Sequence, residues 1–298
     1  MAADATMPPA LVVDREVLGP WSLRTSRDFW EGFAPAALSA QHAPEALHTV
    51  FLGERDWHRV ESVVVQDGGS ARISLTGHGD LAAAADQVSR FLSIDIDARE
   101  WPDVGRRDPV IAIAQERLPG LRPCGFHSPY EAAAWAVLSQ RIRIRQAAVL
   151  RSEIVSRYGE DGAFPTPTTL RTLDLELPGR KNEYLAAVAE AALDGILDGA
   201  ALRSIDAADA IERVQQIKGL GPFAAELVVI RGANAPDVMP TAERRLDAEI
   251  AHQYGSDRSA ASLSEVWRPF RSWAAVHLRA MREIRARDTG ESTMGSMS

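Results

Sequence analysis

Two short stretches of the sequence bring together residue types that can bind an anion and carry out acid–base chemistry. The first, "KGLGPF" at residues 218–223, places two glycines around a leucine and runs into an apolar helical segment. The second, "DVMPTAERRL" at residues 237–246, has Asp237 and Glu243 on either side of a proline. The first stretch is therefore a candidate anion site, and the two acids are the candidates for chemistry.

The glycine stretch is predicted to be a hairpin between two helices. "DAIERVQQI" and "PFAAELVVIRG" both have helical spacing, and only "KGLG" separates them. Gly219 and Gly221 permit the positive backbone dihedrals of such a turn. Bare amides at the start of the second helix then suit an anion, with a DNA phosphate as the natural ligand. On these residues alone, an αα-hairpin whose glycine merely terminates a helix is the favoured explanation of the pattern.

A cluster of arginines supplies a second feature that suits phosphates. The segment "QRIRIRQAAVLR", residues 140–151, contains four arginines and no acid. The whole chain has a net charge of −8, but residues 1–100 account for −7 of it. A local basic patch can therefore meet DNA although the protein is acidic. A solvated helix face is the alternative reading of the same charges.

Composition limits the class of protein. The 298 residues suffice for two domains, and 46% hydrophobic with 25% charged residues is ordinary for a globular chain. The single cysteine, Cys124, excludes an internal disulfide framework and a cysteine-rich metal site, and fits a reducing cytoplasm. The first residues lack the pattern of a signal peptide or a membrane span, so we expect a cytoplasmic protein without a membrane partner.

The residue pattern changes from strand-like to helical near residue 100. Residues 48–77 are rich in Val, Ile and Thr and are broken by "DGG", which predicts antiparallel strands with a hairpin turn, flanked by helices. After about residue 104 helical spacing dominates, including a helix that starts at Ser128 with Pro129 in its first turn and a helix over residues 264–287. The predicted fold class is α+β: an antiparallel-sheet α+β domain (1–100), an all-α domain with the hairpin (101–287) and a disordered tail (288–298).

In combination, these motifs resemble the helix–hairpin–helix DNA glycosylase superfamily and, within it, the bacterial DNA-3-methyladenine glycosylases of alkylation repair. The resemblance rests on the hairpin, on "DVMPTAERRL", on "LSQR" between two helices, on "FPTPTTL" and on "VWRPFRSWAAVHL". It covers residues 90–287 well and the first ninety more loosely. Each motif alone is weak, and together they are specific.

The resemblance implies a mechanism and assigns residues to it. Hairpin amides hold the DNA backbone, a side chain wedges into the duplex, and the damaged base turns out into a pocket. A carboxylate beside C1′ then stabilises the oxocarbenium-like transition state. Glu243 is the first choice for this carboxylate and Asp237 the second. Thr241 is expected to cap a helix whose first turn contains Glu243, where the helix dipole favours the ionised carboxylate. The predicted DNA-binding residues are Gln140, Arg141, Arg143, Arg145, Lys218, Gly219, Gly221 and Arg244. The predicted base pocket contains Phe223, Leu227, Arg279 and Trp135, although core packing is the competing role of Trp135.

The sequence departs from the family pattern at four positions. Glu243 stands where the family has its catalytic aspartate, and Arg141 where it has an apolar wedge. Leu227 and Arg279 replace aromatic residues that line the base pocket. Fewer aromatic faces hold a cationic base less strongly. A substrate other than the cationic methylpurines, such as a bulkier or neutral lesion, is therefore an open alternative.

The lysines and the single cysteine bear on the type of glycosylase. Lys181 and Lys218 are the only lysines, and Phe223 occupies the family's Schiff-base position, so we expect a monofunctional enzyme that leaves an abasic site. One cysteine cannot hold an iron–sulfur cluster. No cofactor is expected beyond the monovalent cation that the family holds at hairpin carbonyls. His127 and His277 are interpreted as packing residues rather than metal ligands.

The main prediction is thus a monofunctional glycosylase that removes 3-methyladenine- and 7-methylguanine-type bases in base excision repair. Its expected partner is double-stranded DNA with a damaged or flipped base, bound by a monomer. The alternative is a catalytically silent relative that binds distorted duplex.

Overall fold

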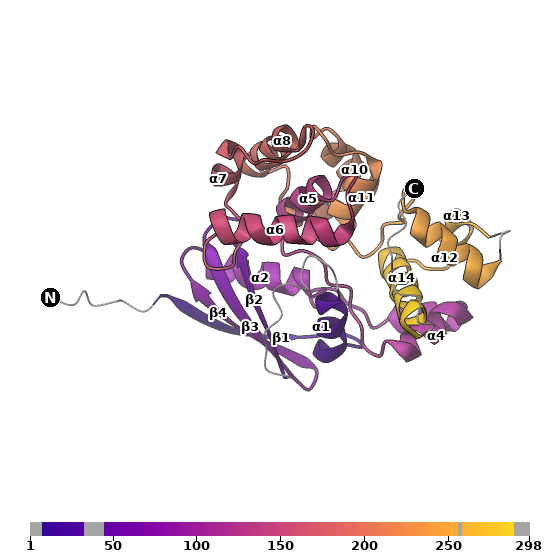
Figure 1. Ribbon diagram of the computed structural model, residues 1–298. Helices are drawn as coiled ribbons and strands as arrows, with labels where there is room; N and C mark the ends of the chain where they lie inside the picture. Colours follow the sequence, from indigo (N-terminus) through magenta and orange to yellow (C-terminus); the bar gives the residue numbers. More distant parts are fainter. Residues whose placement is uncertain (1–7, 33–44, 256–257, 289–298) are drawn as a thin grey trace.

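The computed structural model describes residues 8–32, 45–255 and 258–288. It is built from one antiparallel sheet and a larger set of helices, which confirms the α+β class (Figure 1). The described residues after position 100 contain no strand, as the sequence predicts. The expected tail lies outside the described residues except for Asp288, which ends the last helix.

The sheet has four strands in the order β1-β4-β3-β2, and all neighbouring strands are antiparallel. The strands are β1 (Ala10–Glu16), β2 (Ala46–Leu52), β3 (Arg59–Asp67) and β4 (Ser70–Gly77). The predicted "DGG" turn joins β3 and β4, which pair from Asp67 with Ser70 onward. Strand β1 was not predicted from the sequence; its partner β4 lies some sixty residues later in the chain.

Alternation along the strands buries one face of the sheet, as period-2 patterning requires. Helix α2 (Leu81–Phe91) packs on this face against β1, β3 and β4, and α1 (Leu23–Glu31) contacts β2. Asp80 and Ser22 cap the two helices through their side chains. The resulting core contains Leu47, Phe51, Ile73, Leu75 and Phe91, all almost fully buried.

A second hydrophobic cluster forms around α5 (Pro129–Leu138), every residue of which is buried. Ser128 caps α5 and Pro129 occupies its first turn, as predicted. The helices of this cluster are α6 (Ile144–Tyr158), α7 (Pro167–Thr172), α8 (Lys181–Leu193), α9 (Gly199–Ser204), α10 (Ala207–Gln215), α11 (Pro222–Leu227) and the π-helical turn η1 (Val228–Gly232).

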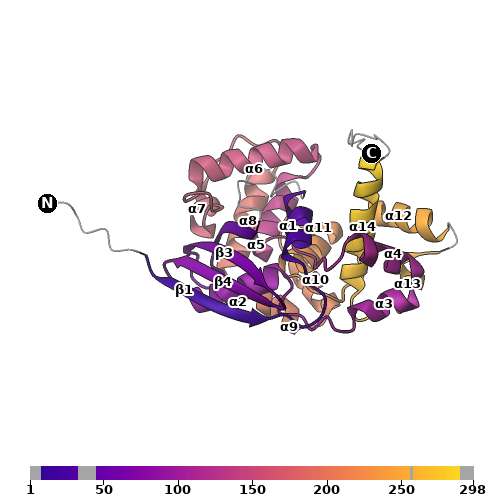
Figure 2. The ribbon, with the colours of Figure 1, turned by 90° about the horizontal axis from the view of Figure 1, so that it is seen from below.

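A third cluster joins helices from both ends of the helical region (Figures 1 and 2). Its helices are α3 (Trp101–Arg107), α4 (Pro109–Arg117), α12 (Arg244–Tyr254), α13 (Ala260–Leu263) and α14 (Arg271–Asp288). Trp267 and Trp273 are fully buried in it. The predicted helix over residues 264–287 is shorter than expected: α14 begins only at Arg271. Pro269 explains this, since proline lacks the amide hydrogen that a helix interior needs.

Buried polar side chains connect the three clusters. Arg122 is fully buried and donates hydrogen bonds to the carbonyls of Leu18, Pro20, Ser93 and Ile96, while its guanidinium lies 5.6 Å from the Trp273 ring centre. Asn234, just after η1, donates to the carbonyls of Arg90 and Phe91. The end of the hairpin helix is therefore fixed to the sheet as well as to the other helices.

Candidate active site

The hairpin has the predicted form, with one correction. Gly219 adopts φ +92, which favours glycine, whereas Gly221 has φ −86 and is the N-cap of α11. Only the first glycine is therefore required by backbone conformation. A Cβ on Gly219 would lie 2.3 Å from Cγ of Tyr184, whereas a Cβ on Gly221 would meet nothing within 4 Å. The backbone at Gly221 is thus open to an approaching ligand.

The turn after α5 lies directly against this hairpin. The side-chain amide of Gln140 donates to the carbonyl oxygen of Gly219 at 2.8 Å. Arg141, next in the chain, has φ +57 and an exposed side chain. A positive φ at a bulky residue is uncommon and points to a constrained turn. Two elements that are eighty residues apart in sequence thus form one surface.

Several of the predicted DNA-binding side chains are exposed. Arg143, the N-cap of α6, Arg145 and Arg244 all reach solvent. Lys218 lies just before the hairpin glycine and pairs with Glu183, with about half of its side chain exposed. Phe223, at the start of α11, is 51% exposed, which is unusual for an aromatic ring.

A buried carboxylate that the sequence analysis missed joins the hairpin helix to the candidate catalytic segment. Glu226 in α11 is 6% exposed and accepts hydrogen bonds from the backbone amides of Thr241 and Ala242 at 2.9 to 3.0 Å. The Thr241 hydroxyl donates to the same carboxylate. The segment just before Glu243 is therefore held at a fixed place relative to the hairpin.

The predicted position of Glu243 within the first turn of its helix is wrong. Thr241 was predicted to cap the helix, but α12 begins at Arg244 and Glu243 itself is the N-cap residue. The hydroxyl and amide of Thr241 are instead engaged by Glu226. Glu243 thus precedes the first turn rather than lying within it.

The Glu243 carboxylate has a basic partner. Its Oε1 lies 2.6 Å from Nε of Arg279 in α14, and the two side chains are 26% and 18% exposed. Burial lowers the pKa of the Arg231 guanidinium at the end of η1, and the charges of Cys124, Glu243 and Glu283 oppose that shift. Arg231 also lies 5.3 Å from the Phe29 ring centre.

No family model matches the sequence. The chain is 24% identical over 212 residues to a DNA-3-methyladenine glycosylase of Bacillus subtilis, covering 64% of this chain and 69% of that one. It is 30% identical over 176 residues to DNA-3-methyladenine glycosylase 2 of Escherichia coli, covering 54% of this chain and 60% of the relative. The resemblance to the helix–hairpin–helix DNA glycosylases is confirmed, in their alkylation-repair branch.

A solved structure shows that the fold is shared. The 3-methyladenine DNA-glycosylase of Archaeoglobus fulgidus superposes with a TM-score of 0.72 over 91% of this chain and 98% of its own, at 19% identity. That agreement includes the sheet as well as the helices, because the match extends over nearly the whole chain. The two proteins thus share one overall fold.

Asp237, the second choice for the catalytic carboxylate, forms ion pairs with two arginines. Its carboxylate accepts hydrogen bonds from the backbone amide of Arg271 at 3.2 Å and from Nε and Nη2 of that residue at 2.8 and 3.2 Å, and Arg268 adds a fourth at 3.2 Å. These contacts fix the start of α14. Asp237 therefore braces the loop, and Glu243 also has an arginine partner, so pairing does not rank the two acids.

One of the predicted pocket residues is enclosed by the core, and a second packs beside it. Trp135 is 4% exposed within the cluster around α5, so its ring offers no open face and the core interpretation replaces the pocket one. Leu227 packs against the same cluster while remaining partly accessible. His127 and His277 are buried, and burial lowers their pKa values to about 3 and about 4, so both are neutral packing residues. The described residues contain no cluster of acids, histidines and cysteine able to hold a metal.

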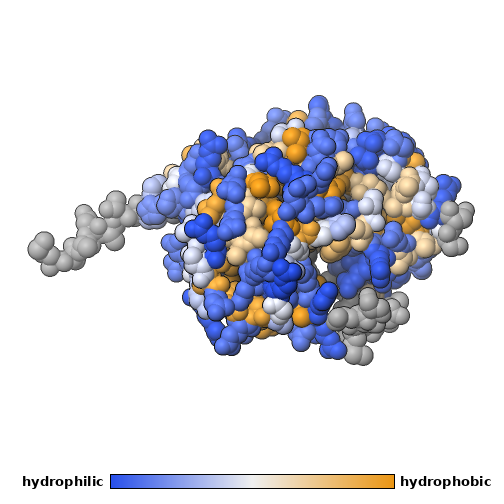
Figure 3. Space-filling model, turned by 90° about the horizontal axis from the view of Figure 1, so that it is seen from above, coloured by the Kyte–Doolittle hydropathy of each residue, from blue (hydrophilic) through white to orange (hydrophobic). Residues whose placement is uncertain are grey.

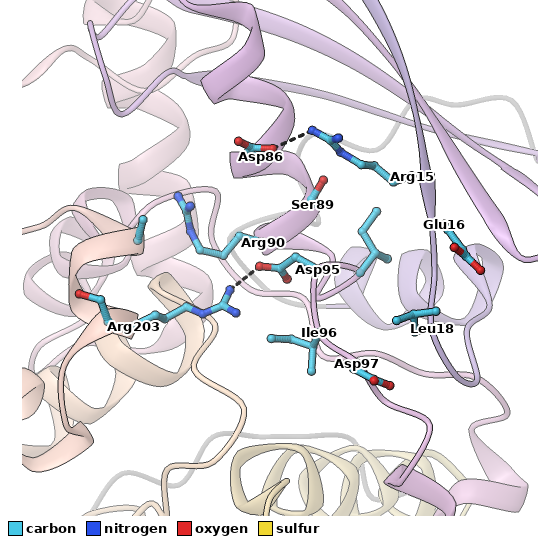
Figure 4. A pocket seen from close by; sticks show the side chains of 13 residues that line it. Arg15, Glu16, Leu18, Asp86, Ser89, Arg90, Asp95, Ile96, Asp97 and Arg203 are labelled. Atoms are coloured by element: carbon cyan, nitrogen blue, oxygen red, sulfur yellow. Dashed lines mark hydrogen bonds and ion pairs between the residues drawn. The ribbon is translucent and has the colours of Figure 1, made fainter.

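A cavity of about 530 Å³ lies away from these residues, between β1, α2, α9 and the loop at Asp95 (Figure 4). Its charges are largely paired: Arg15 with Asp86 and Arg203 with Asp95, both at 2.7 Å. It contains none of the predicted site residues.

The described part of the chain has no helix of the length and apolarity that a membrane span requires. The face in Figure 3 is mainly hydrophilic.

Proposed function

We propose that the protein is a monofunctional DNA glycosylase that removes alkylated bases from double-stranded DNA in base excision repair. The similarity to DNA-3-methyladenine glycosylases supports this function. The main structural support is the set of hydrogen bonds that the Glu226 carboxylate accepts from Thr241 and Ala242. These bonds hold the segment before Glu243 at a fixed distance from the hairpin. A group that binds the DNA backbone and a carboxylate that acts on the sugar must be held in such a fixed relation.

The hairpin and the arginines hold the DNA in this proposal. Backbone amides around Gly221 approach one phosphate, and Arg143, Arg145, Arg244 and Lys218 contact others. Arg141, at the tip of the adjoining turn, enters the duplex where the damaged base has turned out. A guanidinium can stack on bases and also bind phosphates, so it can replace an apolar wedge. The helical region from residue 101 to 287 acts as the glycosylase domain, and a monomer suffices.

The reaction needs only the carboxylate and water. As the bond between C1′ and the base nitrogen breaks, its electron pair leaves with the base and positive charge develops on the sugar. The Glu243 carboxylate stabilises this charge. Water adds to C1′ and its proton leaves, so that the products are an abasic site and the free base. Phe223 and Leu227 line the space beside the base.

A monovalent cation at the hairpin is not required for this reaction. Two of the hairpin carbonyls, those of Ile217 and Gly219, already accept hydrogen bonds from Leu220 and Gln140. Fewer oxygens are thereby left for a cation. We therefore assign no step to it.

The test is base release from alkylated DNA. We expect slow release by the wild type, because glutamate is one methylene longer than aspartate and a displacement of about 1 Å can cost around a hundredfold in rate. Glu243→Gln should lose most of this activity and still bind abasic duplex. Asp237→Asn is a control for a nearby acid outside the chemistry.

Two results would change the proposal. Equal release by the wild type and Glu243→Gln would remove Glu243 from the mechanism and make Asp237 the residue to test. Binding of distorted duplex by both proteins without any base release would favour the silent DNA-binding alternative.

A further inference from the structure

The charge balance around Glu243 differs from that of an isolated carboxylate. Nε of Arg279 approaches its Oε1 to 2.6 Å, and the Arg279 and Glu243 side chains are only 18% and 26% exposed. This ion pair contains one guanidinium group and one carboxylate and has no net charge.

Such a balance disfavours a cationic base. A base methylated at a ring nitrogen, such as 7-methylguanine, carries a positive charge before its bond to the sugar breaks. In this site it meets a carboxylate whose charge is already matched by Arg279, and it meets the guanidinium itself. Screening by water is incomplete because Arg279 is 18% exposed. The attraction that would otherwise draw a cationic base toward Glu243 is therefore weakened.

The same guanidinium assists a neutral base. When the bond to C1′ breaks, a neutral base departs with the electron pair and becomes negatively charged until it takes up a proton from water. A fixed positive charge beside the leaving base stabilises that developing charge, and it costs no reorganisation at the moment of reaction. A cationic base departs as a neutral molecule and gains nothing from it.

We infer that Arg279 makes the site selective for electrically neutral alkylated bases over cationic ones. This inference rests on the proposed function and names the class of base that the same site takes. Arg279 is the specificity-determining residue, and Glu243 keeps its role beside C1′.

The first test measures binding alone, with two bases of nearly the same shape and different charge. Duplexes carry 7-methylguanine, which is cationic, or 7-methyl-7-deazaguanine, which is neutral, each on a 2′-fluoro sugar that resists cleavage. We expect the wild type to favour the neutral base, and Arg279→Met to lower the ratio of the two affinities about tenfold. Arg279→Lys keeps the charge and should retain the preference. Arg282→Met removes a charge from the same helix and should change the ratio less than twofold.

The second test measures release of 7-methylguanine and of neutral 1,N6-ethenoadenine. Arg279→Met should release 7-methylguanine faster and ethenoadenine more slowly than the wild type. If Arg279→Met leaves both ratios unchanged, the inference is wrong whatever the activity. If no variant releases any base while the binding ratio still depends on Arg279, the proposed function fails and the charge selection stands.

Discussion

The two hairpin glycines should respond differently to the same substitution. At Gly219, alanine must adopt φ +92, which costs about 1–2 kcal/mol, and its Cβ would lie 2.3 Å from the Tyr184 ring. Overpacking of that kind adds about 1–3 kcal/mol. The free energy of unfolding should thus fall by about 2–5 kcal/mol in Gly219→Ala. At Gly221 the backbone is ordinary and a Cβ meets nothing, so Gly221→Ala should change it by less than about 1 kcal/mol.

For DNA affinity, in contrast to stability, Gly221 should be the more sensitive of the two hairpin glycines. Gly221→Val is expected to remain folded and to bind duplexes of any sequence more weakly, since its side chain stands where a phosphate approaches the amides. Urea unfolding measures the first effect, and fluorescence anisotropy against salt concentration measures the second. Equal stability of Gly219→Ala and the wild type would refute the steric argument. Unchanged DNA affinity of folded Gly221→Val would return the hairpin to a purely structural role.

Three further substitutions test other parts of the structure. Arg141→Ala should weaken binding to abasic duplex more than to intact duplex by anisotropy; an equal loss would make it an ordinary phosphate contact. Glu226→Ala should lower kcat more than tenfold with little change in KM, with partial rescue by glutamine; a change in KM alone would contradict a positioning role. Burial raises the pKa of Glu54 from 4.5 to about 7, against the opposing effect of its buried ion pair with Arg90. Its stabilising contribution is therefore present below pH 4.5 and lost as the pH rises to 7. The free energy of unfolding relative to Glu54→Gln should fall by about 3 kcal/mol over that range. Parallel pH profiles of the two proteins would contradict this prediction.

Features set by neighbouring residues were predictable from the sequence. Ser128 and Pro129 begin α5 because their cap and dihedral preferences act within one helical turn. Gly219 marks the hairpin for the same local reason. The start of α14 was predicted too early, because the helical spacing of the apolar residues continues across Pro269, although the helix itself begins only after this proline.

Features that depend on distant residues were not predictable. Strand β1 has a sequence of mixed polarity and becomes a strand through its pairing with β4. Glu226 reads as one polar residue in an apolar helix, and its role appears only when Thr241 and Ala242 are brought beside it. The partner of Glu243 lies thirty-six residues away on α14. Pair contacts of this kind leave no periodic signal.

These distant contacts determine how binding and chemistry are coupled in the proposed enzyme. Gln140 joins the wedge turn to the hairpin, and Glu226 joins the hairpin helix to the segment before Glu243. A displacement of the hairpin on binding DNA would therefore be transmitted to both the wedge and the carboxylate. Arg279 belongs to a different element, α14, which meets this segment through two ion pairs, Arg279 with Glu243 and Arg271 with Asp237. DNA binding and catalysis thus depend on one connected set of contacts, and the choice of base depends on a side chain that is itself paired with the carboxylate of that set.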